Sequence, residues 1–176
     1  MATDRRVIKT RTAIASSFKR LLERNDLEDI TIKMICDEAN IGRKTFYLHF
    51  SDKYELMDQF LNAYLEQLFA ACQDLNPNQL EAKTLIWLEF FQTNQRFFAN
   101  LFRSSSSYLF RQKFYEFTRK SLLNKNLQLD PIELEFIDYG IDGLMEAIVV
   151  KNDFDNLPEL AKKIAQILLK FENEAK

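Results

Sequence analysis

The sequence has 176 residues, of which 47% are hydrophobic and 28% are charged, and its net charge is −2. This length suffices for one large domain, or for a small domain joined to a medium one, with a proper hydrophobic core. The sequence contains no apolar run near the ~20 residues of a membrane span and lacks the hydrophobic stretch of a signal peptide at its start. We therefore expect a cytoplasmic protein that makes no use of a membrane.

Helices should dominate the fold, because three Gly and three Pro residues leave little room for hairpins. We predict an all-α protein of about nine helices. The two cysteines, Cys36 and Cys72, lack the spacing of a metal site, and the chain has a single His. We therefore predict two free thiols, no metal and no cofactor.

Charge is distributed unevenly along the chain. Residues 1–53 contain eleven Lys or Arg against eight Asp or Glu, whereas residues 54–176 contain thirteen against eighteen. The first predicted helix, from about Asp4 to Arg24, is strongly basic over its first four turns. A basic helix suits a phosphate backbone, although a solvated helix face would have the same composition.

Residues 31–50 predict two short helices joined by a tight turn. Thr31 can cap the first helix, and Asn40 tolerates the left-handed conformation that ends it. Gly42 then allows the backbone to reverse before Arg43 opens the second helix. The apolar face of the first helix consists of Ile32, Ile35, Cys36 and Ala39.

In the second helix, Phe46 and Phe50 face inward one turn apart, and Lys44, Thr45 and Leu48 project to the opposite side. An aromatic underside with cationic and hydroxyl groups on the outer side is the layout of a recognition helix that enters a DNA major groove. The pair of helices is therefore predicted to be a helix-turn-helix.

The remaining helices follow from turn and cap signals. Ser51-Asp52 opens a long fourth helix, Asn76-Pro77-Asn78 forms the clearest boundary, and Asp130-Pro131 caps a late helix. Ser104 to Ser107 predict a loop. The predicted helices after residue 50 cover about 52–74, 79–91, 94–102, 108–124, 131–150 and 157–173.

One ordered set of residues is more specific than the helix pattern alone: Ile14-x3-Phe18-x3-Leu22, Thr31, Ile35-Cys36, Ala39-Asn40-Ile41-Gly42, Thr45-Phe46-Tyr47, His49-Phe50 and Lys53-x2-Leu56. Over roughly residues 5–60, this set resembles the TetR family of bacterial transcriptional regulators. Asn40 stands where the family usually has Gly, and Gly42 where it often has Ser. Asn can supply the same turn, whereas Gly predicts a weaker cap on the recognition helix.

The resemblance implies an N-terminal three-helix DNA-binding domain at residues 1–52 and a C-terminal helical ligand-binding and dimerisation domain at residues 53–176. It implies a homodimer that binds a palindromic operator in double-stranded DNA, most often as a repressor released by a small-molecule effector. A single recognition helix covers too few base pairs to find one site in a genome, which also favours a dimer.

By the same resemblance, DNA-contacting residues divide into two sets. The residues expected at base edges are Lys33, Arg43, Lys44, Thr45 and Leu48. Those expected at phosphates are Thr31, Tyr47, His49 and Lys53.

Alternatives remain open for several of these residues. Thr31 can serve as a helix cap alone, His49 as a hydrogen-bonded core residue, and Tyr47 as a packing residue. Arg5 and Arg6 suit a minor-groove arm, or a disordered tail.

In the family, the last two helices form the dimer interface as a four-helix bundle. The residues that would supply its apolar faces here are Ile141, Leu144, Ile148, Leu160, Ile164, Ile167, Leu168 and Phe171. Gly140 and Gly143 weaken the helix that contains them, so close approach of a second helix would explain their presence. Packing within one subunit competes with this interpretation.

Sixteen Phe residues, most of them after residue 89, predict either an aromatic core or a small-molecule pocket. The residues predicted to line such a pocket are Trp87, Phe90, Phe91, Phe98, Phe102, Phe114, Phe117 and Tyr139. No spacing in the sequence identifies the effector.

The alternatives to an effector-controlled repressor are an enzyme and a regulator that is controlled by a protein partner. An enzyme is not expected, because the sequence has no glycine-rich phosphate loop and no catalytic Ser/His/Asp or Cys/His set. An activator or co-regulator with the same DNA-binding head, controlled by a protein partner, stays open, with the serine loop and residues 108–117 as its docking surface.

Overall fold

The computed structural model describes residues 5–72, 75, 79–104, 107–123 and 130–174. These residues form nine α-helices and one short 3-10 helix, without a strand among them, so the all-α prediction is confirmed. The predicted boundary at residues 76–78 and two of the four serines lie outside the described residues. The helices are α1 (Arg5–Leu22), η1 (Leu27–Asp29), α2 (Ile32–Ala39), α3 (Arg43–Tyr47), α4 (Lys53–Cys72), α5 (Leu80–Thr93), α6 (Gln95–Arg103), α7 (Ser107–Leu123), α8 (Pro131–Lys151) and α9 (Leu157–Glu174).

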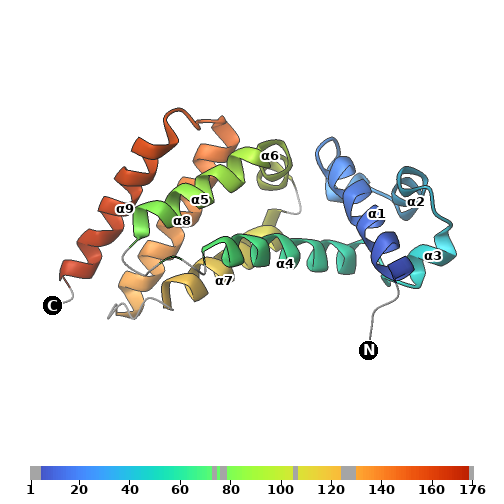
Figure 1. Ribbon diagram of the computed structural model, residues 1–176, viewed down its shortest axis with the longest axis horizontal. Helices are drawn as coiled ribbons and strands as arrows, with labels where there is room; N and C mark the ends of the chain where they lie inside the picture. Colours follow the sequence, from blue (N-terminus) through green and yellow to red (C-terminus); the bar gives the residue numbers. More distant parts are fainter. Residues whose placement is uncertain (1–4, 73–74, 76–78, 105–106, 124–129, 175–176) are drawn as a thin grey trace.

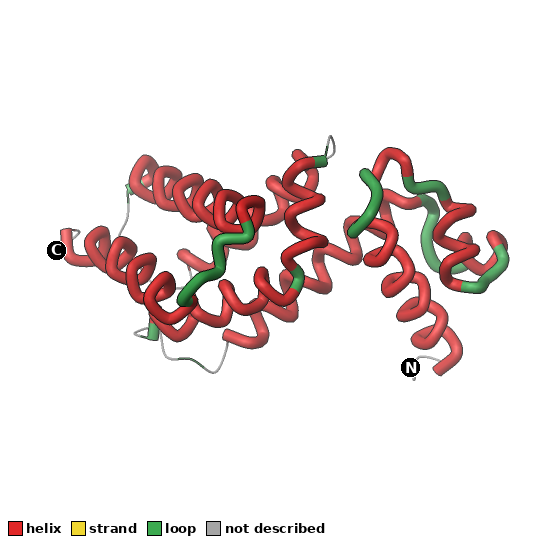
Figure 2. Tube along the Cα trace, turned by 90° about the horizontal axis from the view of Figure 1, so that it is seen from above, coloured by secondary structure: helices red, strands yellow, loops and turns green. Residues whose placement is uncertain are grey.

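The first three helices form a small head at one end of the molecule, and α5 to α9 form a larger group at the other end (Figure 1). Helix α4 runs from the head along the larger group, with α7 beside it. Helix α6 lies where the larger group meets the head. Seen from above in Figure 2, the described part of the chain consists of helices and the loops that join some of them.

Helix ends follow local chemistry that the sequence predicts. The side chain of Asp130 accepts hydrogen bonds from the backbone N–H groups of Ile132 and Glu133, and the Glu133 carboxylate accepts one from the backbone of Asp130. Asp52 caps α4 in a similar way through the N–H groups of Tyr54 and Glu55. The predicted capping of α8 by Asp130 and of α4 by Asp52 is therefore confirmed.

Asparagine supplies the left-handed residues of the described chain. Asn40, Asn152 and Asn156 have φ angles of 52°, 56° and 50°, a region that Asn tolerates better than most residues. Asn40 thus makes the turn after α2 in place of a glycine, as predicted. The expected role of Gly42 is wrong, because its φ of −76° is one that any residue adopts.

The core is continuous from the head to the larger group. On α4, the ring of Phe60 meets Phe18 of α1 at 5.9 Å between centroids and Phe97 of α6 at 5.4 Å. Phe98 of α6 is fully buried, with rings of Phe91 and Phe110 at 4.6 and 5.4 Å. Edge-on and tilted ring pairs at these distances add to the stability gained by burying the rings.

Truncation of Phe98 tests whether this cluster is a filled core. Phe98→Ala should lower the free energy of unfolding by about 3–5 kcal/mol, because it leaves a cavity among other rings. Urea denaturation of the full chain measures the change, with exposed Tyr108→Ala as the control at within about 0.5 kcal/mol of the parent. A loss below about 1 kcal/mol would mean that Phe98 borders open space.

Candidate nucleic-acid interface

The recognition helix is short and tightly anchored. Helix α3 covers only residues 43–47, so the expectation that it extends to Phe50 is wrong, and Leu48 and His49 form a turn after it. Phe46 is fully buried, and its ring meets Phe50 at 5.8 Å. Two rings in the core of the head therefore fix the orientation of a helix that is too short to be stable alone.

The residues predicted at base edges share one outward surface. Lys33 on α2 and Arg43 and Lys44 on α3 are exposed, Thr45 is half-buried, and Leu48 is 74% exposed. Helix α3 lies at the end of the molecule away from α9 (Figure 1). An exposed leucine beside two cations suits a groove that presents both thymine methyl groups and guanine acceptors.

The residues predicted at phosphates differ from one another in exposure and in their contacts. Tyr47 is 55% exposed, and its ring stands edge-on to Phe46 at 5.6 Å. Thr31 is exposed and caps α2 by accepting a hydrogen bond from the N–H of Met34 at 3.2 Å. His49 is half-buried beside the ring of Phe50.

Lys53 has a structural role that the sequence did not predict. Its Nζ donates hydrogen bonds of 2.8 Å to the carbonyl oxygens of Leu27 and Glu28. The Tyr54 hydroxyl bonds to the Glu28 carboxylate at 2.8 Å, which raises the pKa of Tyr54. These contacts attach the start of α4 to the loop that precedes the helix-turn-helix.

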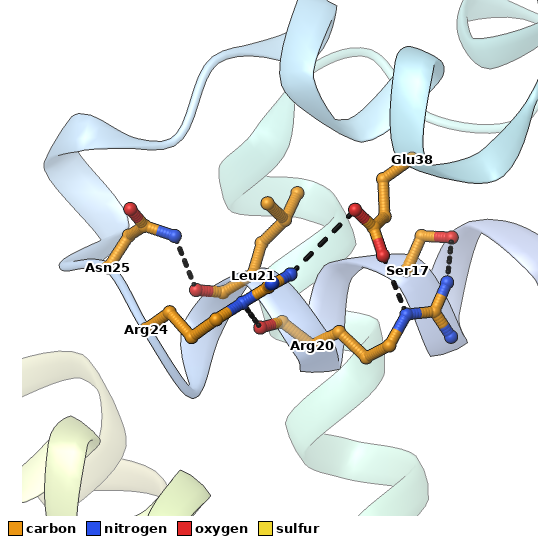
Figure 3. Close-up of polar contacts among 6 residues, drawn as sticks. All are labelled: Ser17, Arg20, Leu21, Arg24, Asn25 and Glu38. Carbon is orange, nitrogen blue, oxygen red and sulfur yellow. Dashed lines mark hydrogen bonds and ion pairs between the residues drawn. The ribbon is translucent and has the colours of Figure 1, made fainter.

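Helix α2 is held against α1 by an ion-pair cluster (Figure 3). Arg20 Nε donates to Glu38 Oε1 at 2.7 Å, and the Arg24 guanidinium lies 3.7 Å from Glu38 Oε2. The hydrogen bond from Arg20 is the largest cause of a lowered pKa for Glu38. Arg20 also donates a hydrogen bond to the Ser17 hydroxyl, and Arg24 donates one to the Arg20 carbonyl oxygen. These bonds to neighbouring residues orient both guanidinium groups toward Glu38.

Other cations of α1 also make contacts within the protein. Arg11 bonds to Gln59 and lies 4.9 Å above the Phe50 ring, and Lys19 donates to Asn94 Oδ1 at 2.7 Å. The basic composition of α1 thus serves partly to join α1 to its neighbours. No local signal in the sequence predicts these contacts, because their partners are distant in the chain.

The residues predicted to line a pocket divide into three sets in the structure. Phe91, Phe98, Phe102 and Phe114 are buried, and Trp87, Phe90 and Phe117 are half-buried around them. The rings of Trp87 and Phe117 are 5.2 Å apart. Tyr139 lies apart from these rings, exposed on α8 and paired with Tyr115 of α7.

The residues predicted at the dimer interface also divide. Ile148 and Ile164 are buried in the core of the chain, whereas Leu144 and Ile167 are exposed. Ile141, Leu160, Leu168 and Phe171 are half-buried. The outer face of α8 presents further apolar and small residues: Ile132, Phe136, Tyr139, Gly140 and Gly143.

Two kinds of site are missing from the described residues. No three His, Cys, Asp or Glu side chains among them are grouped so that they could hold a metal ion. Among the same residues, no helix combines the length and apolar character needed to cross a membrane. The Cys36 thiol is buried, which raises its pKa.

A buried aromatic anchor and an exposed cationic surface on the second helix of the pair define a helix-turn-helix DNA-binding protein. Residues 18–60 match the family model described as bacterial regulatory proteins, tetR family. These residues therefore form a DNA-binding domain of the kind found in TetR-family transcriptional regulators.

Relatives support this assignment over different lengths. YxbF of Bacillus subtilis (strain 168), an uncharacterized HTH-type transcriptional regulator, is 42% identical over 59 residues, which cover 33% of this chain and 16% of YxbF. DhaS of Lactococcus lactis subsp. lactis (strain IL1403), an HTH-type dhaKLM operon transcriptional activator, is 28% identical over 118 residues, which cover 67% of this chain and 60% of DhaS. The chain thus spans less than two thirds of the length of either curated relative.

Solved structures share the whole fold. A TetR transcriptional regulator from Streptococcus agalactiae 2603V superposes with a TM-score of 0.72 at 23% identity, covering 93% of this chain and 96% of that one. The superposition therefore includes the head, α4, α6 and the larger group of helices together.

The missing cap of α3 gives a direct test of the head. Gly42 is the N-cap, its side chain makes no cap bond, and an added Cβ would meet nothing within 4 Å. Gly42→Ser should raise the free energy of unfolding by about 0.5–1 kcal/mol in urea denaturation, through the new cap bond and a less flexible unfolded chain. Gly42→Ala supplies the Cβ without the oxygen, and equal stability of the two variants would contradict a cap.

Proposed function

We propose that the protein is a homodimeric repressor that binds a palindromic operator and is released by a small-molecule effector. The observation that supports this most directly is α3, which exposes Arg43, Lys44 and Leu48 while Phe46 anchors it in the head. Arg and Lys pair with guanine O6 and N7, and Leu contacts a thymine methyl. Lys33 and Thr45, with the predicted phosphate contacts Thr31, Tyr47 and His49, complete the DNA surface in this proposal. Lys53, the fourth predicted phosphate contact, also holds the start of α4 through its bonds to Leu27 and Glu28.

Dimerisation follows from the size of this surface and from α8. Five helical residues contact a few base pairs, so two heads about 34 Å apart are needed for a genomic site. The exposed face of α8 contains Phe136, which is 68% exposed, beside Gly140 and Gly143, whose open Cβ positions leave room for a second helix. Leu144 and Ile167 extend this surface in the proposed interface.

Helix α6 supplies the coupling between the two ends of the molecule. Asn100 donates hydrogen bonds to the carbonyl oxygens of Leu22 at 2.7 Å and Asn25 at 3.1 Å, so α6 holds the end of α1. At α8, Gln95 donates to the Val149 carbonyl oxygen at 2.8 Å. An effector that moves α6 would therefore change the position of the head.

We place the effector contact at the half-buried rings of Trp87, Phe90 and Phe117. The fully buried rings beside them fill the core. An apolar or planar compound that inserts at the edge of this cluster would reach α6 through Phe98.

The second candidate is an activator controlled by a protein partner. DhaS, which shares the fold at a TM-score of 0.68 and 23% identity, is named an operon activator. The described residues give such a partner an exposed site at the start of α7, where Tyr108 and Leu109 are exposed.

One experiment separates these functions. Purified protein is used to select fragments from genomic DNA at fixed salt, the preferred fragment is footprinted, and transcription from it is measured in vitro. A two-fold symmetric footprint with reduced transcript supports the repressor, and increased transcript supports the activator. Binding without sequence enrichment, which falls steeply with salt, would contradict both.

Base contact and phosphate contact should separate by mutation. Arg43→Ala should cost about 1–3 kcal/mol of binding to the selected site and relax the preference at one base pair per half-site. Tyr47→Phe, which removes only a hydroxyl, should weaken binding to all fragments about equally. Competition binding against single-base variants measures both, and an unchanged preference in Arg43→Ala would refute its assignment to a base.

The glycine face of α8 gives a matched test of the dimer. Gly143→Leu should convert the dimer to monomer in analytical ultracentrifugation, because the new side chain occupies the space for a second helix, while the fold of each chain persists. The control Glu89→Leu adds a leucine to an exposed position of α5 and should stay dimeric. A Gly143→Leu protein that dimerises as the parent does would show that α8 is not the interface.

A further inference from the structure

Four carboxylates of α8 lie along the side that packs against α7. Glu135, Asp138, Asp142 and Glu146 recur at helical spacing, and the cations of α7 that face them are Arg111 and Arg119. Arg111 forms a two-pronged ion pair with Glu146, with Nη2 at 2.7 Å from Oε1. Among the described residues, neither of the two inner carboxylates, Asp138 and Asp142, accepts a hydrogen bond from an arginine as Glu146 does.

Asp138 is the most unusual of these groups because it is fully buried. Among the residues that the structure describes, neither of its carboxylate oxygens has a hydrogen-bond partner. The closest cation, Arg119, lies 3.7 Å from Oδ2 and donates its hydrogen bond to the Tyr115 hydroxyl at 2.7 Å instead. A buried anion in this position is expensive, because its ion pair does not replace the hydrogen bonds that water would make.

Asp142 is placed where a carboxylic acid fits better than a carboxylate. Its Oδ1 is 3.0 Å from the Thr118 hydroxyl oxygen, which is also 2.7 Å from the Phe114 carbonyl oxygen. A threonine hydroxyl has one hydrogen to donate, and within a helix it commonly goes to the carbonyl four residues earlier. A protonated Asp142 can donate to the Thr118 oxygen, so that both contacts are satisfied at once.

We propose that Asp138 and Asp142 hold at least one proton while α8 packs against α7, and that release of this proton to solvent at higher pH weakens the contact between the two helices. Three features carry this proposal: Asp138 is fully buried, Asp142 is half-buried, and Thr118 has a single hydrogen to donate. Because α8 also holds α6 through Gln95, the protonation state bears on the same helix that holds the end of α1.

The other groups around the pair act in both directions, since Arg111 and Arg119 favour the ionised forms and Glu135 favours the protonated one. From α7, Tyr115 and Arg119 face Asp138, and on α8 itself Glu135 adds negative charge. From α6, Arg103 donates to the Val150 carbonyl oxygen at the far end of α8. The side of α8 that contains Leu134, Ile137 and Ile141 meets Leu168 and Phe171 of α9, which are apolar.

The pKa values agree with the geometry. Burial raises the pKa of Asp138 to about 6, opposed by Arg119. Burial also raises the pKa of Asp142 to about 7, assisted by the charge of Asp138 and opposed by Arg111 and, where Thr118 donates its hydrogen to the carboxylate, by that bond. Since both values exceed the ordinary 3.8 of an unfolded chain, the folded chain binds more protons between pH ~4 and pH ~7, and stability must fall as pH rises through this window.

Other acids of the chain act in a separate range. The pKa values of Glu38, Glu55 and Glu146 are lowered by hydrogen bonds, to Arg20, Ser51 and Arg111 respectively. The stability that these groups contribute is lost only as pH falls below the ordinary pKa of a glutamate, about 4.5. A change between pH ~5 and pH ~8 therefore lies outside the range in which these three glutamates act, and the variant below assigns it to the pair on α8.

Thermal unfolding of the full chain between pH ~5 and pH ~8, at constant ionic strength, tests the proposal. The melting temperature of the parent should fall by about 3 °C or more over this range. Asp142→Asn, whose amide donates to Thr118 as the acid does, should melt higher than the parent at pH ~8 and lose much of the pH dependence. The control Asp155→Asn, in the exposed turn before α9, should keep the profile of the parent.

Parallel pH profiles for the parent and Asp142→Asn would overturn the proposal. If the variant does not fold, the carboxyl carbons of the parent's aspartates are titrated by NMR. At least one folded-state aspartate should titrate above pH ~5. Titration of all the aspartates near pH ~4, the ordinary value, would overturn the proposal as well.

Discussion

The ring of Phe60 is the contact on which the arrangement of the molecule depends. Helix α4 places this ring against Phe18 of the head on one side and Phe97 of α6 on the other. Because the same side chain belongs to both groups of helices, neither group can rotate about α4 without losing aromatic contact. The head and the larger group therefore share one aromatic core at this point.

Hydrogen bonds and ion pairs add directional contacts to this apolar packing around Phe60. Asn100 and Lys19 join α6 and α1 by hydrogen bonds of 2.7 Å, while Glu38 joins α1 to α2 through Arg20. Such bonds are individually modest in net energy but strict in direction. The apolar core therefore sets the stability of the joint, and the amides and ion pairs set its angle.

Much of this arrangement could be predicted from the sequence, because helix caps and apolar periodicity are local. The start of α8 is predicted by the capping pair Asp130 and Glu133, and the end of α2 is predicted by Asn40. Each of these residues lies within a few positions of the helix end that it predicts. The aromatic residues after residue 89 could not be sorted in the same way. Whether a ring such as Phe98 fills a core or borders a space depends on helices far away in the chain, and so does the partner of Lys53. The burial of Asp138 could not be predicted either, because an aspartate in an amphipathic helix is ordinarily exposed.

The five-residue length of α3 has a consequence for how DNA binding responds to heat and mutation. A helix of this length has no stability of its own and exists only while Phe46 and Phe50 stay in the head. Loss of DNA affinity on warming should therefore follow the local opening of the head, ahead of the melting of the whole chain. Substitutions that loosen α1 or α2 without touching DNA would lower the working temperature of the regulator.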